Sequence, residues 1–129
     1  MRNKVVLDTS FLSSLINIDD KNHSLAASIY STRVANSEIV IPLQSKIELF
    51  VMKKEIASLN RILEFLNNFN YKTDYLNSKQ EFHLIEFIEK NDPRLKSGDL
   101  LILFSAFNNN AELITFDEKL EREFQRIMG

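Results

Sequence analysis

Four acidic residues of this chain stand where their side chains could act together. Asp8 and Asp117 each follow a short apolar stretch, and Glu48 and Asp99 each lie near the start of a helical pattern. Carboxylates gathered in a partly dry site raise one another's pKa, and a divalent cation relieves that repulsion. With no Cys and only two His, oxygen ligation of Mg²⁺ or Mn²⁺ is favoured over zinc. An ion held in this way can activate water for phosphodiester hydrolysis.

The elements that would position these acids alternate along the chain. Hydrophobic patterning predicts strands over residues 4–7, 38–41, 71–76 and 112–115. It predicts helices over residues 10–18, 23–34, 43–56, 58–68, 79–90, 99–107 and 118–127. Because helices separate the successive strands, the strands are expected to run parallel. The predicted fold is therefore a three-layer α/β domain, and residues 1–129 are expected to form one domain.

This topology predicts where the four acids meet. The carboxyl ends of parallel strands share one edge of the sheet, and crossover helices begin near that edge. Asp8 and Asp117 would follow two strands there, and Glu48 and Asp99 would stand near the starts of two helices. We therefore expect four carboxylates around one crevice.

Each acid also has a purely structural interpretation. Asp8 could cap the helix that follows it. Residues 45–48 match a capping box, and so do residues 115–118, where Asp117 could be the N-cap. Asp99 could simply complement a helix dipole. Capping and metal binding are compatible, so both interpretations stay open.

The same patterning predicts which residues fill the core. In the helix over 43–56, the inward-facing residues are expected to be Ile47, Phe50 and Val51. The helix over 79–90 carries three apolar residues on its expected inner face, namely Phe82, Ile85 and Ile88. Most of the ten Phe residues are expected to serve as core filling.

Composition limits the classes of protein that the chain can be. Sixteen Lys and Arg against 18 Asp and Glu give a net charge of -2, which is not the bulk basic signature of a nucleic-acid binder. No apolar run approaches the roughly 20 residues of a membrane span. The lack of Cys fits a cytoplasmic protein, and we expect no membrane association.

Four short motifs, in order and spacing, resemble the PIN domain family, and more narrowly the VapC-type toxins of bacterial and archaeal toxin–antitoxin pairs. The motifs are LDTS at 7–10, SKIEL at 45–49, SGDLLI at 97–102 and LITFD at 113–117. The resemblance implies a PIN-like sheet of four or five strands flanked by helices. The family's short strand after the fourth acid has no clear counterpart here, because residues 118–127 have a helical pattern.

The resemblance also implies roles for individual residues. Asp8, Glu48, Asp99 and Asp117 would hold one or two Mg²⁺ or Mn²⁺ ions as the catalytic set. Two hydroxyls would support them, those of Ser10 and Thr115. Independently of the resemblance, Lys46 and Lys96 adjoin site acids in the sequence and are candidates for contacts to an RNA backbone, although both could equally be ordinary solvated charges.

The implied function is a metal-dependent endoribonuclease that hydrolyses RNA by metal-activated water, as the toxin of a two-component pair. A cognate antitoxin and a homodimer are the implied protein partners. Two alternatives remain. One is a housekeeping RNA-processing nuclease of the same fold without an antitoxin, and the other is a PIN-like interaction module that binds RNA or protein without cutting.

Overall fold

A four-stranded parallel sheet forms the centre of the computed structural model, which describes residues 3–129. The strands are β1 (Lys4–Leu7), β2 (Glu38–Pro42), β3 (Lys72–Asp74) and β4 (Glu112–Ile114), in the spatial order β3-β2-β1-β4. Strand β1 pairs with β2 on one side and with β4 on the other. This arrangement confirms the predicted parallel α/β fold.

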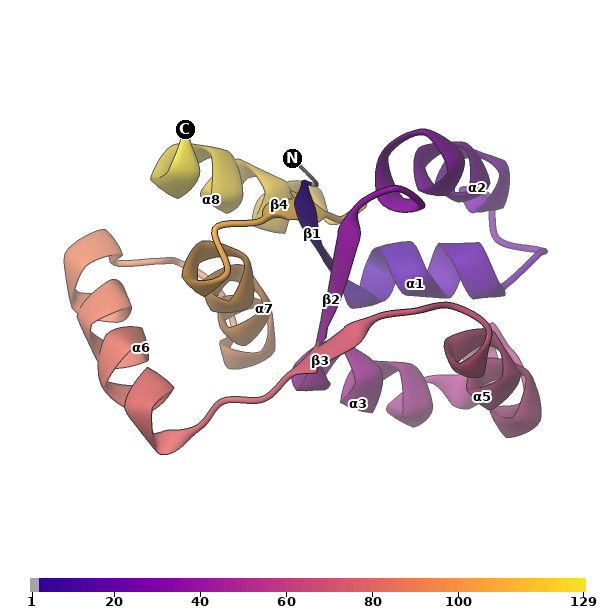
Figure 1. Ribbon diagram of the computed structural model, residues 1–129, viewed down its shortest axis with the longest axis horizontal. Helices are drawn as coiled ribbons and strands as arrows, with labels where there is room; N and C mark the ends of the chain where they lie inside the picture. The colour runs from indigo at the N-terminus through magenta and orange to yellow at the C-terminus, as the bar shows by residue number, and fades with distance from the viewer. Residues whose placement is uncertain (1–2) are drawn as a thin grey trace.

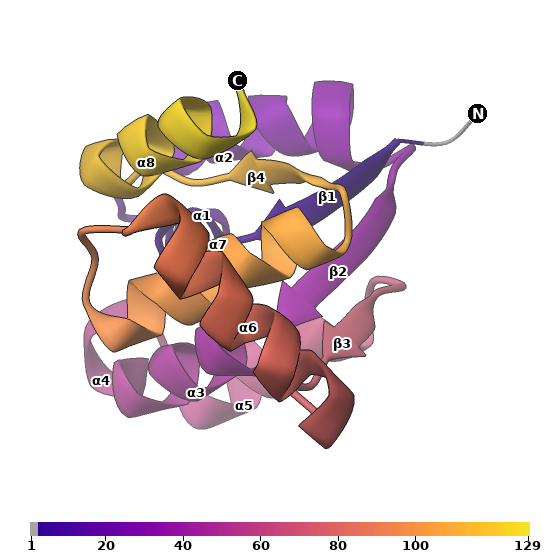
Figure 2. The same cartoon turned by 90° about the vertical axis from the view of Figure 1, so that its left-hand side faces the viewer.

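Helices cover both faces of the sheet. One face carries α1 (Thr9–Ile16), α2 (His23–Ile29), the π-helical turn η1 (Tyr30–Val34), α3 (Leu43–Val51), α4 (Lys53–Ile56) and α5 (Leu59–Asn67). The other face carries α6 (Ser78–Asn91), α7 (Ser97–Asn108) and α8 (Glu118–Met128). Figures 1 and 2 show the two groups of helices on opposite sides of the strands.

The two faces of the sheet bury alternate residues of each strand. Val5 and Leu7 of β1 join the core beneath α1, whereas Val6 between them joins the core beneath α7. Strand β2 repeats the pattern, with Ile39 facing the first core and Val40 the second. Strands buried on both faces read as continuous apolar runs, which is why KVVL and EIVIP are strands.

The central position of β1 fixes where the chain's first acid lies. Asp8 follows the last residue of β1, and its backbone N–H donates to the carbonyl of Ile114 at the end of β4. The two strands therefore end side by side, and the residues after them, Asp8 and Thr115, leave the sheet at the same edge.

Two predicted helices differ from the structure in their continuity. The helix expected over 43–56 breaks at Met52, where the backbone leaves helical geometry and a short helix, α4, begins. The break allows Ile56 to enter the core, while Val51 just before it is 77% exposed. The segment expected as one helix over 23–34 is helical throughout, but its second part is the π-helical turn η1 rather than α-helix.

The expectations about inward-facing residues are wrong for most of the residues named on α3 and α6. On α3, Ile47 and Val51 face outward, whereas Phe50 packs against the core as expected. Leu49, which was not named, is the fully buried residue. On α6, all three residues expected inside are exposed, namely Phe82, Ile85 and Ile88. Helix α6 instead packs through Phe87, whose ring lies 5.6 Å from that of Phe104 between centroids. Phe82 and Phe107 are exposed, but the other eight Phe residues are buried in the two cores or pack against them, which confirms that most of the ten serve as core filling.

The remaining differences lie at element ends. Strand β3 has only three residues where residues 71–76 were expected. Between residues 3 and 129 the sheet has four strands, the lower of the two numbers expected. Across this same described stretch, no helix combines the length and apolarity needed to cross a lipid bilayer.

The orientation of α3 generates a stability prediction. Leu49→Ala should lower the free energy of unfolding by about 2–5 kcal/mol, because it leaves a cavity in the core. Val51→Ala, two residues further along the same helix, should change it by less than about 0.5 kcal/mol, because Val51 is exposed. Urea unfolding of both variants measures the difference. Equal effects would contradict the orientation of this helix.

Candidate functional site

The four acids predicted from the sequence line one pocket, which we call the acidic pocket. It has a volume of about 370 Å³ and lies at the carboxyl edge of the sheet, beside the starts of α1 and α8. The four predicted acids come from four separate segments: the β1–α1 junction, the middle of α3, the first turn of α7 and the N-cap of α8. The residues lining it are Asp8, Thr9, Ser10, Ser13, Ser14, Asp20, Asn22, Glu48, Met52, Asp99, Phe116 and Asp117.

Asp8 is the most deeply placed of these acids, with only 4% of its surface exposed. One carboxylate oxygen, Oδ2, accepts hydrogen bonds from the hydroxyls of Ser10 at 2.7 Å and Thr115 at 2.6 Å. Burial raises the pKa of Asp8 above its ordinary value, and these hydrogen bonds only partly oppose the rise. Asp8 occupies the N-cap position of α1, but its side chain makes no capping bond.

The hydroxyls of Ser10 and Thr115 link an early and a late segment of the chain beside Asp8. Their oxygens lie 3.1 Å apart, and each donates its proton to Asp8. As acceptors they bind backbone N–H groups, Ser10 that of Phe116 and Thr115 that of Asp117. The two side chains therefore hold the segment that carries Asp117 against the segment that carries Asp8.

Glu48 is held by two residues that the sequence analysis did not single out. The buried hydroxyl of Thr9 donates to its Oε1 at 2.6 Å, and the amide of Gln44 donates to its Oε2 at 2.8 Å. Gln44 lies four residues before Glu48 on α3, a spacing at which helical side chains meet, so this partner had a sequence signal. No sequence signal indicated Thr9, which follows Asp8, as a partner of Glu48.

The glycine before Asp99 leaves room for the Glu48 side chain. A Cβ atom added at Gly98 would lie 2.8 Å from Oε2 of Glu48 and 3.1 Å from Nε2 of Gln44. Any larger residue would therefore displace the carboxylate. The capping box suggested over 45–48 is wrong, because Ser45 lies inside α3 with its buried hydroxyl unpaired among the described residues.

Asp99 and Asp117 each lie at the start of a helix, α7 and α8 respectively. Asp117 caps α8 by accepting hydrogen bonds through Oδ1 from the backbone N–H groups of Lys119 and Leu120. Asp99 lies in the first turn of α7, where burial raises its pKa. Repulsion from Asp117, then from Asp8 and Glu48, raises that pKa further, and only Lys96 lowers it.

The donor chemistry of the acidic pocket fits a hard divalent cation. All four acids offer carboxylate oxygens, and the mutual repulsion that raises the pKa of Asp99 is what such an ion relieves. Within residues 3–129, however, no three acidic or histidine side chains stand close enough together to hold one ion. Several of the carboxylate oxygens turn toward hydroxyl, amide or backbone donors instead. One ion could therefore be held by one or two of these carboxylates together with water molecules, and a larger set of ligands would need side chains to turn.

The other candidate residues lie at varying distances from the acidic pocket. Lys96 is exposed at the N-cap of α7, and its charge acts on Asp99. Lys46 does not line the pocket, because its Nζ donates to Thr73 and lies over the ring of Tyr71. Asp20 and Asn22, on the loop between α1 and α2, do line the pocket and were missed because that loop read only as a polar break.

Comparisons with known proteins agree with this fold. A family model described as "PIN domain" matches residues 5–123. The crystal structure of VapC20 from Mycobacterium tuberculosis, a sarcin–ricin loop cleaving toxin, is 15% identical with a TM-score of 0.72, covering 92% of this chain and 93% of that one. VapBC2 from Rickettsia felis, bound to a DNA fragment from its promoter, is 21% identical with a TM-score of 0.65 and 92% of each chain covered. A comparison with curated proteins gives no significant match.

The raised pKa of Asp8 generates a prediction of pH dependence. Because folding raises this pKa, the cost of burying the ionised carboxylate is complete above the folded pKa. That cost disappears as the pH falls toward the ordinary value of 3.8. Asp8→Asn should therefore be more stable relative to the wild type at about pH 7 than at about pH 4. Urea unfolding at both pH values measures this, and a difference that does not change with pH would count against the burial argument.

Proposed function

Because this chain belongs to the PIN domain family, we propose that it is a Mg²⁺- or Mn²⁺-dependent endoribonuclease that hydrolyses RNA phosphodiester bonds. The observation that carries the proposal is the convergence of Asp8, Glu48, Asp99 and Asp117 on one pocket. The raised pKa values of Asp8 and Asp99 support it, since perturbed carboxyl groups in a cleft are typical of functional sites.

Asp8, Glu48, Asp99 and Asp117 would be the metal ligands. A bound Mg²⁺ or Mn²⁺ would neutralise these carboxylates, polarise a phosphoryl oxygen and make water a better nucleophile. Asp99 accepts no hydrogen bond from residues 3–129, so its carboxylate is also available to orient the attacking water and take its proton. Ser10 and Thr115 would keep Asp8 in one orientation during this step.

An RNA strand would approach a pocket whose own charge is negative. Lys96 is the cation beside the site acids, so it is the first candidate for a contact to a phosphate near the scissile bond. Lys46 would serve only an RNA that extends across α3 toward β3, because Lys46 is held near Thr73. We keep both residues as proposed backbone contacts and expect Lys96 to contribute more.

The biological setting that we propose is that of a toxin paired with an antitoxin. The similarity of fold to VapC20 and to VapBC2 supports this setting. We further infer a homodimer, a cytoplasmic location and a single domain over residues 1–129. A housekeeping nuclease would share the chemistry, but its induced expression would not arrest growth as that of a toxin would. An interaction module would bind RNA without cutting it.

Ribonuclease activity is the central test of the proposal. The purified protein should cleave RNA in Mg²⁺ or Mn²⁺ and stop when EDTA is added. Asp8→Ala and Asp99→Ala should each lower the rate by about 100-fold or more, because each removes several kcal/mol of charge stabilisation. Glu89→Gln, which removes an exposed charge from α6, is the control and should cleave normally. Cleavage that persists in EDTA, or full activity in the Asp variants, would overturn the mechanism.

The hydrogen bond from Thr9 to Glu48 generates a second prediction. Thr9→Val keeps the shape of the side chain but removes the donor that orients Oε1, so the affinity for Mn²⁺ should fall by about tenfold. Thr32→Val removes a hydroxyl that bonds only to a helix carbonyl and should leave the affinity unchanged. Calorimetric titration with Mn²⁺ measures both variants. Unaltered binding by Thr9→Val would remove Glu48 from the proposed ligands.

A further inference from the structure

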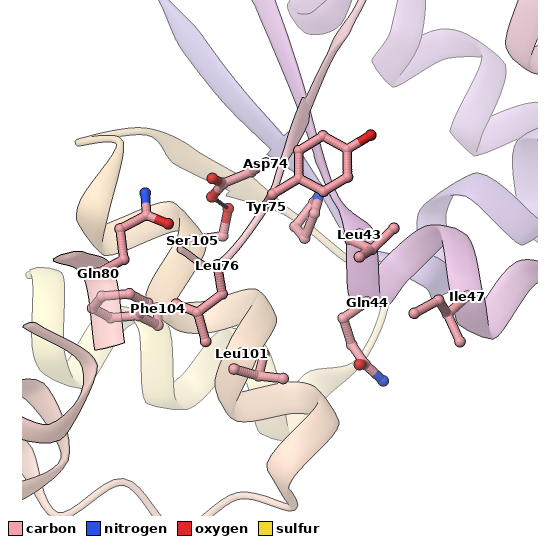
Figure 3. Close-up of a pocket in the computed structure, with 11 residues that line it drawn as sticks. Leu43, Gln44, Ile47, Asp74, Tyr75, Leu76, Gln80, Leu101, Phe104 and Ser105 are labelled. Carbon is pink, nitrogen blue, oxygen red and sulfur yellow. Dashed lines mark hydrogen bonds between the residues drawn. The ribbon is translucent and has the colours of Figure 1, made fainter. Parts of the chain in front are cut away.

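A second pocket lies beside the acidic pocket and shares none of its lining residues. It has a volume of about 200 Å³ and opens between the start of α3, the segment that follows β3, and α7 (Figure 3). We call it the β3 pocket. Its volume is below the range of about 300–1,000 Å³ typical of small-molecule sites, and it suits a single large side chain better.

The walls of the β3 pocket are mostly apolar and open to the surface, with Gln44 and Gln80 as neutral polar side chains among them. They are formed by Leu43 and Ile47 of α3, Tyr75 and Leu76 after β3, and Leu101 and Phe104 of α7. Four of these are substantially exposed, at 39% for Leu43, 47% for Ile47, 60% for Tyr75 and 48% for Leu76. Contiguous apolar surface of this kind is typical of a place where another molecule docks.

One charged residue lines the β3 pocket, the half-buried Asp74. Its Oδ2 accepts hydrogen bonds from the Ser105 hydroxyl at 2.5 Å and from the Asn109 amide at 3.0 Å. Its Oδ1 accepts none from residues 3–129, and no Lys, Arg or His nitrogen of that stretch comes within 4.0 Å. The carboxylate is therefore fixed in orientation by α7 and has no cation of its own.

We propose that the β3 pocket binds an arginine side chain of a protein partner. The apolar walls suit the aliphatic stem of arginine, and Asp74 at the polar end suits its guanidinium. Guanidinium is planar and weakly hydrated and stacks on aromatic faces such as that of Tyr75, which makes it a better occupant than the strongly hydrated ammonium of lysine. A phosphate is unsuitable, because no cationic side chain among residues 3–129 lines the pocket.

The experiment uses the full chain and small probes of stated chemistry. Nα-acetyl-arginine amide is titrated while backbone amide signals are followed by NMR, with the neutral citrulline analogue and the lysine analogue as matched controls. The arginine probe should shift signals of Tyr75, Leu76, Gln80 and Leu101. The citrulline and lysine analogues should bind less tightly, citrulline by about tenfold or more.

Two variants locate the binding. Asp74→Asn should weaken the arginine probe by about tenfold or more, because it removes the charge but keeps an oxygen to accept from Ser105. Leu76→Lys, which places a cation at the exposed rim, should weaken binding as well. Glu89→Gln, a loss of charge elsewhere on the surface, should bind as the wild type does. Ribonuclease activity is not a readout here, so this proposal can fail without affecting the proposed function.

Several outcomes would overturn the proposal. They are equal binding of the citrulline or lysine analogue, full binding by Asp74→Asn, and shifts confined to acidic-pocket residues such as Ser10 and Thr115. A further one is a dimer in the free wild type that Leu76→Lys dissociates, because the occupant would then be a second copy of this chain.

Discussion

The burial of the Asp8 carboxyl group at the centre of the sheet edge is the constraint on which the rest of the site depends. Strand β1 is flanked on both sides by other strands, so the residue after it cannot reach open solvent and is 4% exposed. A carboxylate in that position is unfavourable without compensation. The hydroxyls of Ser10 and Thr115 provide part of it, and they do so only because β4 ends beside β1.

The other three acids add electrostatic repulsion to the site and do not compensate for the burial of Asp8. Asp99 experiences the charges of three neighbouring acids, and within the described part of the chain it is the charge of Lys96 that offsets them. The clustered negative charge at one edge of the sheet therefore destabilises the fold, and the two hydrophobic cores supply the stability that offsets it. Such a conflict between stability and charge placement is typical of functional sites, and it fits the divalent cation that we propose as the ligand of these acids.

The sequence predicted the sheet well because strands buried on both faces are short, wholly apolar runs with few alternatives, as in β1 and β2. It predicted the faces of α3 and α6 poorly. Both helices carry exposed apolar residues, Val51 and Phe82 among them, so their patterns fit more than one inner face. Glu48 was recognised as a site acid, but its contact with Thr9, 39 residues away, depends on tertiary packing that no local pattern encodes.

The bond between Thr115 and Asp8 joins residues 107 positions apart, which has a consequence for the order of events in the cell. The ribosome makes Asp8 first and Thr115 more than a hundred residues later, so a growing chain holds the early acid without its late partners. The acidic pocket cannot close until residues up to Asp117 have been synthesised and have left the exit tunnel.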